Sequence, residues 1–172
     1  STPAQFPRYA SGLEKFDGTP LYERQNPAEA IHPFWGTLLY NYGSPMVKDF
    51  LISNACFWAE VYHADGLRMD DVDAMLYLDY GRNPGEWTPN IYGTNENLDA
   101  LEFLKHLNSV IKERNPGLLL VAQENGLWPE LTDSVENDHL GFDYKWSGGW
   151  TKDLLEYLSK DPIERKNYHD QL

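Results

Sequence analysis

Two short segments, the second of them almost continuously apolar, constrain the fold of this chain most strongly. They are residues 67–70 (LRMD) and 118–123 (LLLVAQ), and both are predicted to be strands. Helical periodicity precedes each one, over residues 45–62 and about 96–114, and a third helix is predicted to open at Thr151. Strands that lack a polar face and alternate with helices are typical of parallel sheets covered by helices. The pattern therefore predicts an α/β fold with a parallel sheet.

The two helices that precede the strands each present an apolar stripe toward the predicted core. Ser44 and Pro45 begin the first helix, because serine caps a helix and proline fits its first turn. The residues predicted to face inward are Val47, Leu51, Ala55, Trp58 and Tyr62 on the first helix, and Leu98, Leu101, Leu104 (or Lys105), Asn108 and Ile111 on the second.

Long connections follow both predicted strands, and they favour a barrel. Residues 71–94 are predicted to form a loop with one helical turn near its start, residues 1–44 another long ordered loop, and Trp128 lies in the connection after residue 123. A (β/α) barrel carries its chemistry in loops at the carboxyl ends of its strands. A doubly wound sheet is the alternative, but the chain has no glycine-rich phosphate loop. The predicted fold class is therefore α/β, as part of a (β/α)8 TIM-type barrel.

Charge and cysteine content disfavour several classes of partner. The formal net charge of -13 argues against nucleic acids and anionic membranes, and no apolar run has membrane-spanning length. The single cysteine, Cys56, excludes an internal disulfide and suits a reducing compartment, and its apolar helical surroundings favour a buried structural thiol over a nucleophile. The histidines are scattered, so no metal site is expected, and no cofactor motif is present.

The spacing of Arg68 and Asp70 predicts a candidate catalytic pair. Residues two apart in a strand point to the same face, so the guanidinium and the carboxylate should lie side by side. An arginine beside a carboxylate favours its ionised form, which a carboxylate nucleophile requires. A structural salt bridge at a strand end explains the same spacing. Aromatic residues make up 14% of the chain, which suits stacking on sugars, although packing alone can account for most of them.

Three longer stretches give the chain a resemblance to a known family. They are residues 63–108 (HADGLRMDDVDAMLYLDYGRNPGEWTPNIYGTNENLDALEFLKHLN), 115–132 (NPGLLLVAQENGLWPELT) and 140–150 (LGFDYKWSGGW). In these stretches the chain resembles bacterial glycogen (1,4-alpha-glucan) branching enzymes of the alpha-amylase superfamily. Residues 16–23 (FDGTPLYE), 32–43 (HPFWGTLLYNYG) and 156–169 (EYLSKDPIERKNYH) share the resemblance, so that the similarity covers nearly the whole chain.

The resemblance implies a catalytic (β/α)8 barrel set between an N-terminal sandwich and a C-terminal β domain. Residues 1–172 would then be a fragment of that barrel, its central portion after the third strand, and the two ends of the sequence read like cuts through a longer protein. The implied reaction is a retaining transfer that cuts α-1,4 and forms α-1,6 glucan linkages in a bacterial cytoplasm, without a cofactor. Asp70 falls on the nucleophile and Arg68 on its companion, and Trp128 lies in a loop expected to bind sugar.

The sequence departs from the family pattern at three positions. The general acid is usually a glutamate where this chain has Gln123, and an amide cannot donate a proton at neutral pH. Glu124 has the right chemistry, but strand alternation predicts that it points away from Asp70. Gln5 stands where the family has a sugar-binding histidine. Asp71 stands where alanine is common, and would raise the pKa of Asp70 unless it points away.

These departures leave several interpretations open. Three origins are consistent with them: a natural variant that uses Gln123 or a shifted Glu124, a binding-only paralogue, and an enzyme with a deliberate acid-to-amide substitution. An amylase-type hydrolase or a debranching enzyme is the competing catalytic interpretation. Expressed alone, the 172-residue fragment is predicted to be inactive.

Overall fold

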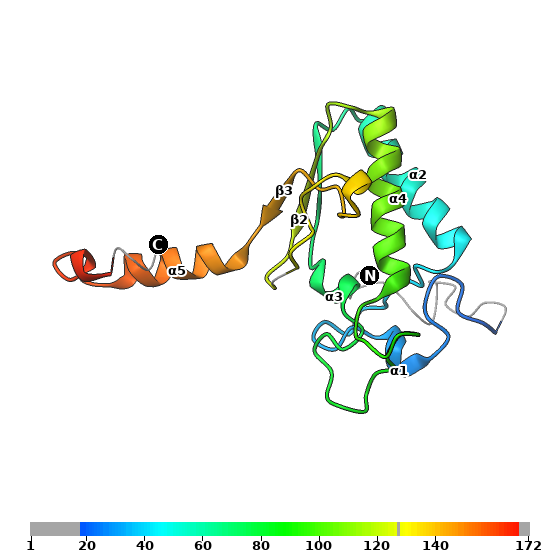
Figure 1. The fold of residues 1–172 in the computed structure, drawn as a ribbon, viewed down its shortest axis with the longest axis horizontal. Coiled ribbons are helices and arrows are strands. Elements are labelled where there is room, and N and C mark those ends of the chain that lie inside the picture. The colour runs from blue at the N-terminus through cyan, green and yellow to red at the C-terminus, as the bar shows by residue number, and fades with distance from the viewer. Residues whose placement is uncertain (1–17, 127, 169–172) are drawn as a thin grey trace.

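The computed structural model describes residues 18–126 and 128–168, which form a parallel three-stranded sheet and several helices (Figure 1). Along the chain the elements are α1 (Pro27–Ala30), α2 (Pro45–Glu60), β1 (Gly66–Met69), α3 (Asp73–Leu76), α4 (Leu98–Arg114), β2 (Leu119–Gln123), the 3-10 helix η1 (Val135–Asn137), β3 (Tyr144–Trp146), α5 (Gly148–Ser159) and the 3-10 helix η2 (Arg165–Asn167).

The sheet has the order β1-β2-β3, and both pairings are parallel. Met69 of β1 lies opposite Ala122 of β2, and Gln123 lies opposite Trp146 of β3. The predicted parallel α/β arrangement is confirmed. β3 was not predicted, because it is only three residues long and all three side chains are exposed, so no apolar run marks it.

The helix α4 supplies much of the core and lies beside α2 (Figure 1). It begins after Asn97, whose side chain accepts a hydrogen bond from the Ala100 N–H, and it ends with Lys112 and Arg114 in its last turn, where positive charge complements the helix dipole. Of the predicted stripe, Leu104, Asn108 and Ile111 are buried and Leu98 and Leu101 are half-buried. Phe103 and Leu107, also buried, were missed.

The helix α2 corrects part of the predicted apolar face. Val47 is fully buried, and Cys56 is buried as predicted. Trp58 and Tyr62, however, are 46% and 61% exposed, and Tyr62 lies beyond the end of the helix. In the second half of α2 the side that packs on the core passes through Cys56 and Ala59, so Trp58 falls at its flank.

The segments outside the sheet agree with the prediction in outline. The expected helical turn after the first strand is α3, and the third helix begins three residues earlier than expected, at Gly148. Along α5, whose residues are all described, none is buried, and the helix extends away from the sheet (Figure 1). Within the described residues, no helix is both long and apolar enough to cross a bilayer.

Candidate active site

The carboxyl ends of β1 and β2 lie at one edge of the sheet and bring four predicted or suspected site residues together. Asp70 and Asp71 follow β1, while Gln123 ends β2 and Glu124 follows it. Because the two strands are parallel neighbours, these residues meet at a single edge. Each of the four side chains has a different environment there, and these environments limit what it can do.

Asp70 and Arg68 form the pair that their spacing predicted. Arg68 Nε lies 2.8 Å from Asp70 Oδ1, and both side chains are largely exposed. The guanidinium carbon also lies 5.0 Å from the centre of the Trp146 ring, a cation–π contact that the sequence did not predict. The pair leaves the Asp70 carboxylate reachable from solvent and next to a positive charge, as an attacking carboxylate requires.

Gln123 faces the backbone that follows Asp70. Its Oε1 accepts a hydrogen bond of 2.9 Å from the Asp71 N–H. With the oxygen used in this way, the amide group is left with hydrogens to donate, but it holds no proton that it can transfer as an acid. The side chain therefore suits holding a sugar oxygen better than protonating one.

Glu124 is completely buried, in contrast to its neighbour Gln123. Its carboxylate forms an ion pair with Lys145, and Asp73 lies beside it. Burial, and then the neighbouring Asp73 carboxylate, raise the pKa of Glu124, while Lys145 acts in the opposite direction. A raised pKa suits a proton donor, but a substrate oxygen has no access to this carboxyl group in the present arrangement.

The turn after β2 is held by the same three charged side chains, of which Glu124 and Asp73 are buried. Asp73 accepts hydrogen bonds from the N–H groups of Asn125 (2.9 Å) and Gly126 (3.3 Å), and Lys145 donates to the Gly126 carbonyl oxygen at 2.9 Å. A Cβ atom on Gly126 would lie 2.5 Å from Glu124 Oε1, so a larger residue at this position would have to displace the Glu124 carboxyl group. The turn is therefore closely packed around Glu124.

Asp71 points into the protein and not toward Asp70's ion pair. Its Oδ2 lies 2.9 Å from His32 Nε2, and its Oδ1 accepts a hydrogen bond of 2.9 Å from the Tyr80 hydroxyl. The His32 Nδ1 atom accepts from the N–H groups of Phe34 and Trp35, so the ring proton sits on Nε2 and is donated to Asp71. Burial, and then the bond to Asp71, raise the pKa of Tyr80 above its ordinary value.

Neither of these two partners of Asp71 was predicted from the sequence. His32 lies 39 positions away in the chain and Tyr80 nine, both outside the predicted strands. Trp128 is half-buried and meets Tyr77 edge-on at 5.6 Å between ring centres, so much of its ring packs against the core. Gln5, the remaining predicted site residue, lies outside the described residues.

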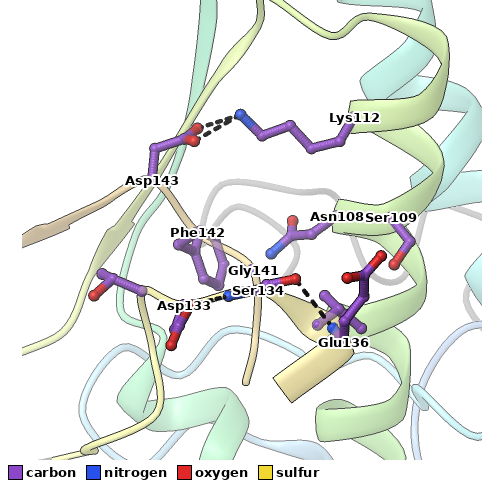
Figure 2. Close-up of a pocket in the computed structure, with 11 residues that line it drawn as sticks. Asn108, Ser109, Lys112, Asp133, Ser134, Glu136, Gly141, Phe142 and Asp143 are labelled. Atoms are coloured by element: carbon purple, nitrogen blue, oxygen red, sulfur yellow. Dashed lines mark hydrogen bonds and ion pairs between the residues drawn. The ribbon is translucent and has the colours of Figure 1, made fainter. Parts of the chain in front are cut away.

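A separate pocket of about 590 Å³ lies at the other end of the strands (Figure 2). It is lined by Asn108, Ser109 and Lys112 of α4 and by the ranges 132–136 and 141–143. Figure 2 shows Lys112 reaching across to the Asp143 carboxylate, with which it forms an ion pair. None of the predicted site residues that the structure describes lines this pocket.

The described part of the chain holds no group of three or more His, Cys, Asp or Glu side chains arranged to bind a metal ion. The sheet edge itself presents one exposed carboxylate with its arginine, one amide, and a buried carboxyl group behind them.

Comparison with known proteins gives close relatives over almost the whole chain. A protein named 1,4-alpha-glucan branching enzyme GlgB from Methylococcus capsulatus is 52% identical over 170 residues, which are 99% of this chain and 23% of that protein. The protein of the same name from Thermobifida fusca is 49% identical over 170 residues, which are 99% of this chain and 23% of that protein. A protein named 1,4-alpha-glucan branching enzyme GlgB 2 from Rhizobium etli is 53% identical over 167 residues, which are 97% of this chain and 23% of that protein. The chain thus spans about a quarter of the length of these relatives.

Two further comparisons add little. No protein-family model matches the chain. Among solved structures, a protein described as a family GH13_31 enzyme matches with a TM-score of 0.41 and 19% identity, over 63% of this chain and 21% of that one.

Proposed function

Because the chain belongs to the family of bacterial 1,4-alpha-glucan branching enzymes, we propose that it is part of the catalytic domain of such an enzyme, which cuts α-1,4 and forms α-1,6 linkages in a glucan. The observation that carries the proposal is the identity of about half of all residues over 99% of the chain. The Asp70–Arg68 pair at the sheet edge supports it with a reachable carboxylate at the position of the expected nucleophile.

In the proposed reaction Asp70 acts as the nucleophile of a double displacement. A carboxylate oxygen of Asp70 bonds to the anomeric carbon while the bond from that carbon to the leaving glycosidic oxygen breaks, and the leaving oxygen takes up a proton. The 6-hydroxyl of an acceptor chain then attacks the same carbon, loses its proton and frees Asp70. Arg68 holds the Asp70 carboxylate in place through their ion pair.

The source of the leaving-group proton is the unusual part of the proposed site. Retaining enzymes place a second carboxyl group about 5 Å from the nucleophile, and Gln123 stands where this group is expected. Its amide hydrogens can bond to the glycosidic oxygen without transferring a proton. For Glu124 to serve instead, the turn at residues 124–126 would have to open and separate its carboxyl group from Lys145. Turnover is therefore expected to be slow as the chain stands.

The presence of Gln123 in place of the expected acid favours one second candidate, a glucan-binding protein that has lost catalysis. It retains the nucleophile position and the aromatic residues of the edge, but it presents an amide at Gln123 and keeps Glu124 buried. This candidate predicts glucan binding with no turnover.

For the whole protein we propose that this chain is the central portion of a (β/α)8 barrel, with β1, β2 and β3 as three successive parallel strands. The remaining barrel strands and the flanking domains of the same protein would be its structural partners, an α-glucan its substrate and the cytoplasm its location. Neither a cofactor nor a nucleic-acid or membrane partner is part of the proposal.

The test uses the full-length protein that contains this chain, incubated with amylose. Branch points are counted by proton NMR of the α-1,6 anomeric signal, and reducing ends are measured in parallel. New α-1,6 linkages without a matching rise in reducing ends support branching. A rise in reducing ends alone indicates an amylase-type hydrolase, and binding of amylose with neither product indicates the glucan-binding alternative.

A further inference from the structure

We propose that Trp35, with Phe34 beside it, forms a stacking platform for a glucose ring of the glucan next to the candidate catalytic edge. The inference rests on the proposed function for the nature of its ligand. Its structural basis lies in a short hairpin, residues 31–38, whose contacts with Asp71 tie it to the end of β1.

The hairpin is a closed turn that holds its aromatic tip in a fixed place. Ile31 and Leu38 form an antiparallel bridge, the His32 N–H donates to the Thr37 carbonyl at 2.8 Å, and the Gly36 N–H donates to the His32 carbonyl at 2.9 Å. Gly36 has a φ of 65°, a left-handed conformation that glycine adopts without strain. The tip of this turn carries Trp35, which is 52% exposed, and Phe34, which is 69% exposed.

One side of Trp35 is backed by a buried histidine. The two rings are stacked with their centres 4.4 Å apart and their planes 8° apart, and His32 is only 1% exposed. Three hydrogen bonds hold the imidazole: Nε2 donates to Asp71, and Nδ1 accepts from the N–H groups of Phe34 and Trp35 itself. The indole is thus fixed on one side and open to solvent on the other.

Phe34 is held by a second set of contacts that leads to the same carboxylate. Its ring meets Tyr80 edge-on, with 5.8 Å between centres and 87° between planes. Its edge also packs against Gly81, where a Cβ atom would lie 2.6 Å from Phe34 Cε2. Tyr80 in turn donates its hydroxyl to Asp71. Both aromatic residues are therefore positioned through Asp71, the residue that follows the candidate nucleophile.

This arrangement has the chemistry that a sugar ring requires. Pyranose rings place C–H groups on an apolar face that packs flat against an aromatic ring, and a rigid ring with one free face offers this contact at little cost in conformational entropy. A second group of exposed aromatic residues consists of Phe57, Trp58 and Tyr62. The rings of this group pack on each other, and the group lies near the amino end of β1, away from Asp70.

That contrast supplies a matched control, because Trp58 is 46% exposed, close to the 52% of Trp35. The dissociation constant for maltohexaose is measured by calorimetry on the full-length protein, the Trp35→Ala and Trp35→Tyr variants, and Trp58→Ala. We expect Trp35→Ala to weaken binding about five- to tenfold, Trp35→Tyr to recover most of that loss, and Trp58→Ala to match the wild type. Far-ultraviolet circular dichroism confirms that each variant is folded.

A second experiment measures how far bound maltohexaose protects Trp35 from oxidation in the wild-type protein. N-bromosuccinimide oxidises exposed indoles, and peptide mass spectrometry locates the modified tryptophans. Maltohexaose should slow oxidation of Trp35 and leave that of Trp58 unchanged. If the wild type binds maltohexaose but neither the affinity nor the oxidation depends on Trp35, the platform is wrong and the proposed function stands. If the wild type binds no maltooligosaccharide, both are overturned; if it binds through Trp35 without forming branches, only the proposed catalysis fails.

Discussion

At the scale of single residues, the side chain at position 123 decides whether the sheet edge can complete a turnover. Gln123 already accepts the Asp71 N–H with its Oε1, and a glutamate has the same length and offers the same oxygen. Replacing the amide with a carboxyl group therefore changes the chemistry of the position with little change in its packing. General acid catalysis typically contributes 10²- to 10⁴-fold to the rate.

We accordingly predict that Gln123→Glu raises the rate of α-1,6 transfer by the full-length protein on the order of 100-fold or more. The measurement is the initial rate of branch formation on amylose. Gln123→Leu, which removes both the hydrogen bond to Asp71 and any proton, serves as the control and should show no gain. An unchanged rate in a folded Gln123→Glu protein would mean that loss of the acid is not what limits this site.

Glu124 gives a prediction about pH. Burial and Asp73 raise the pKa of its carboxyl group above its ordinary value, so the folded protein keeps a proton that the unfolded chain releases. The stability contributed by that group is then fully present below the unfolded pKa and decreases as pH rises through the raised, folded pKa.

Glu124→Gln removes this titration. Thermal unfolding of the full-length protein should show the variant gaining stability relative to the wild type as pH increases from about 4 to 8. Glu113→Gln, an exposed position on α4, provides the control and should show a constant difference. A difference for Glu124→Gln that shrinks with rising pH would show that Lys145 outweighs burial and Asp73 in setting the pKa of Glu124.

At the scale of elements, the periodicity of apolar residues predicted the two longest helices and the strand β2. Strand β2 was found because residues 118–122 are continuously apolar, β1 because a short segment follows the helix break at Asp65 and Gly66, and α2 and α4 because their stripes repeat at helical spacing. The exposed strand β3 carries no such pattern, and it is defined only by its pairing with β2. The face of α2 was misjudged at Trp58 because spacing alone does not reveal where along a helix its neighbour packs.

The candidate site divides in the same way. The Arg68–Asp70 pair follows from two positions in one strand, and the direction of Asp71 follows from alternation. His32 and Tyr80 could not be found, because hydrogen bonds between distant loops depend on tertiary folding that leaves no local spacing. The resemblance to branching enzymes identified Gln123 and Glu124 as the acid-bearing turn. The hydrogen bond of Gln123 and the buried ion pair of Glu124 could not be predicted, because their partners lie in other segments of the chain.

The turn after β2 offers a test at this scale. A Cβ atom on Gly126 would meet Glu124 Oε1 at 2.5 Å, whereas one on Gly117 would meet nothing within 4 Å, and neither glycine has a positive φ. Gly126→Ala should therefore lower the free energy of unfolding by about 1–3 kcal/mol through overpacking beside a buried charge. Gly117→Ala should be neutral or slightly stabilising. Equal stabilities of the two variants, measured by chemical denaturation, would show that the turn is looser than its contacts indicate.

At the scale of the whole molecule, the described fold has surfaces that suit a larger domain. Within the described residues β1 and β3 each pair on one side only, and α5 leaves Trp150, Leu155 and Leu158 exposed. Unpaired strand edges and clustered apolar side chains are covered in stable proteins, because both promote association. The relatives, of which this chain matches 23%, are long enough to supply such covering segments.

From these surfaces we predict that the 172-residue chain, produced alone, forms no α-1,6 linkages and binds the dye ANS more strongly per residue than the full-length protein does. The expected cause is structural. The outer strands β1 and β3 and the apolar side of α5 remain uncovered, and the candidate nucleophile lacks the rest of its barrel. Gln123→Glu should therefore fail to create activity in the isolated chain even if it does so in the full-length protein. Branch formation by the isolated chain would contradict this and would place a complete catalytic centre within these residues.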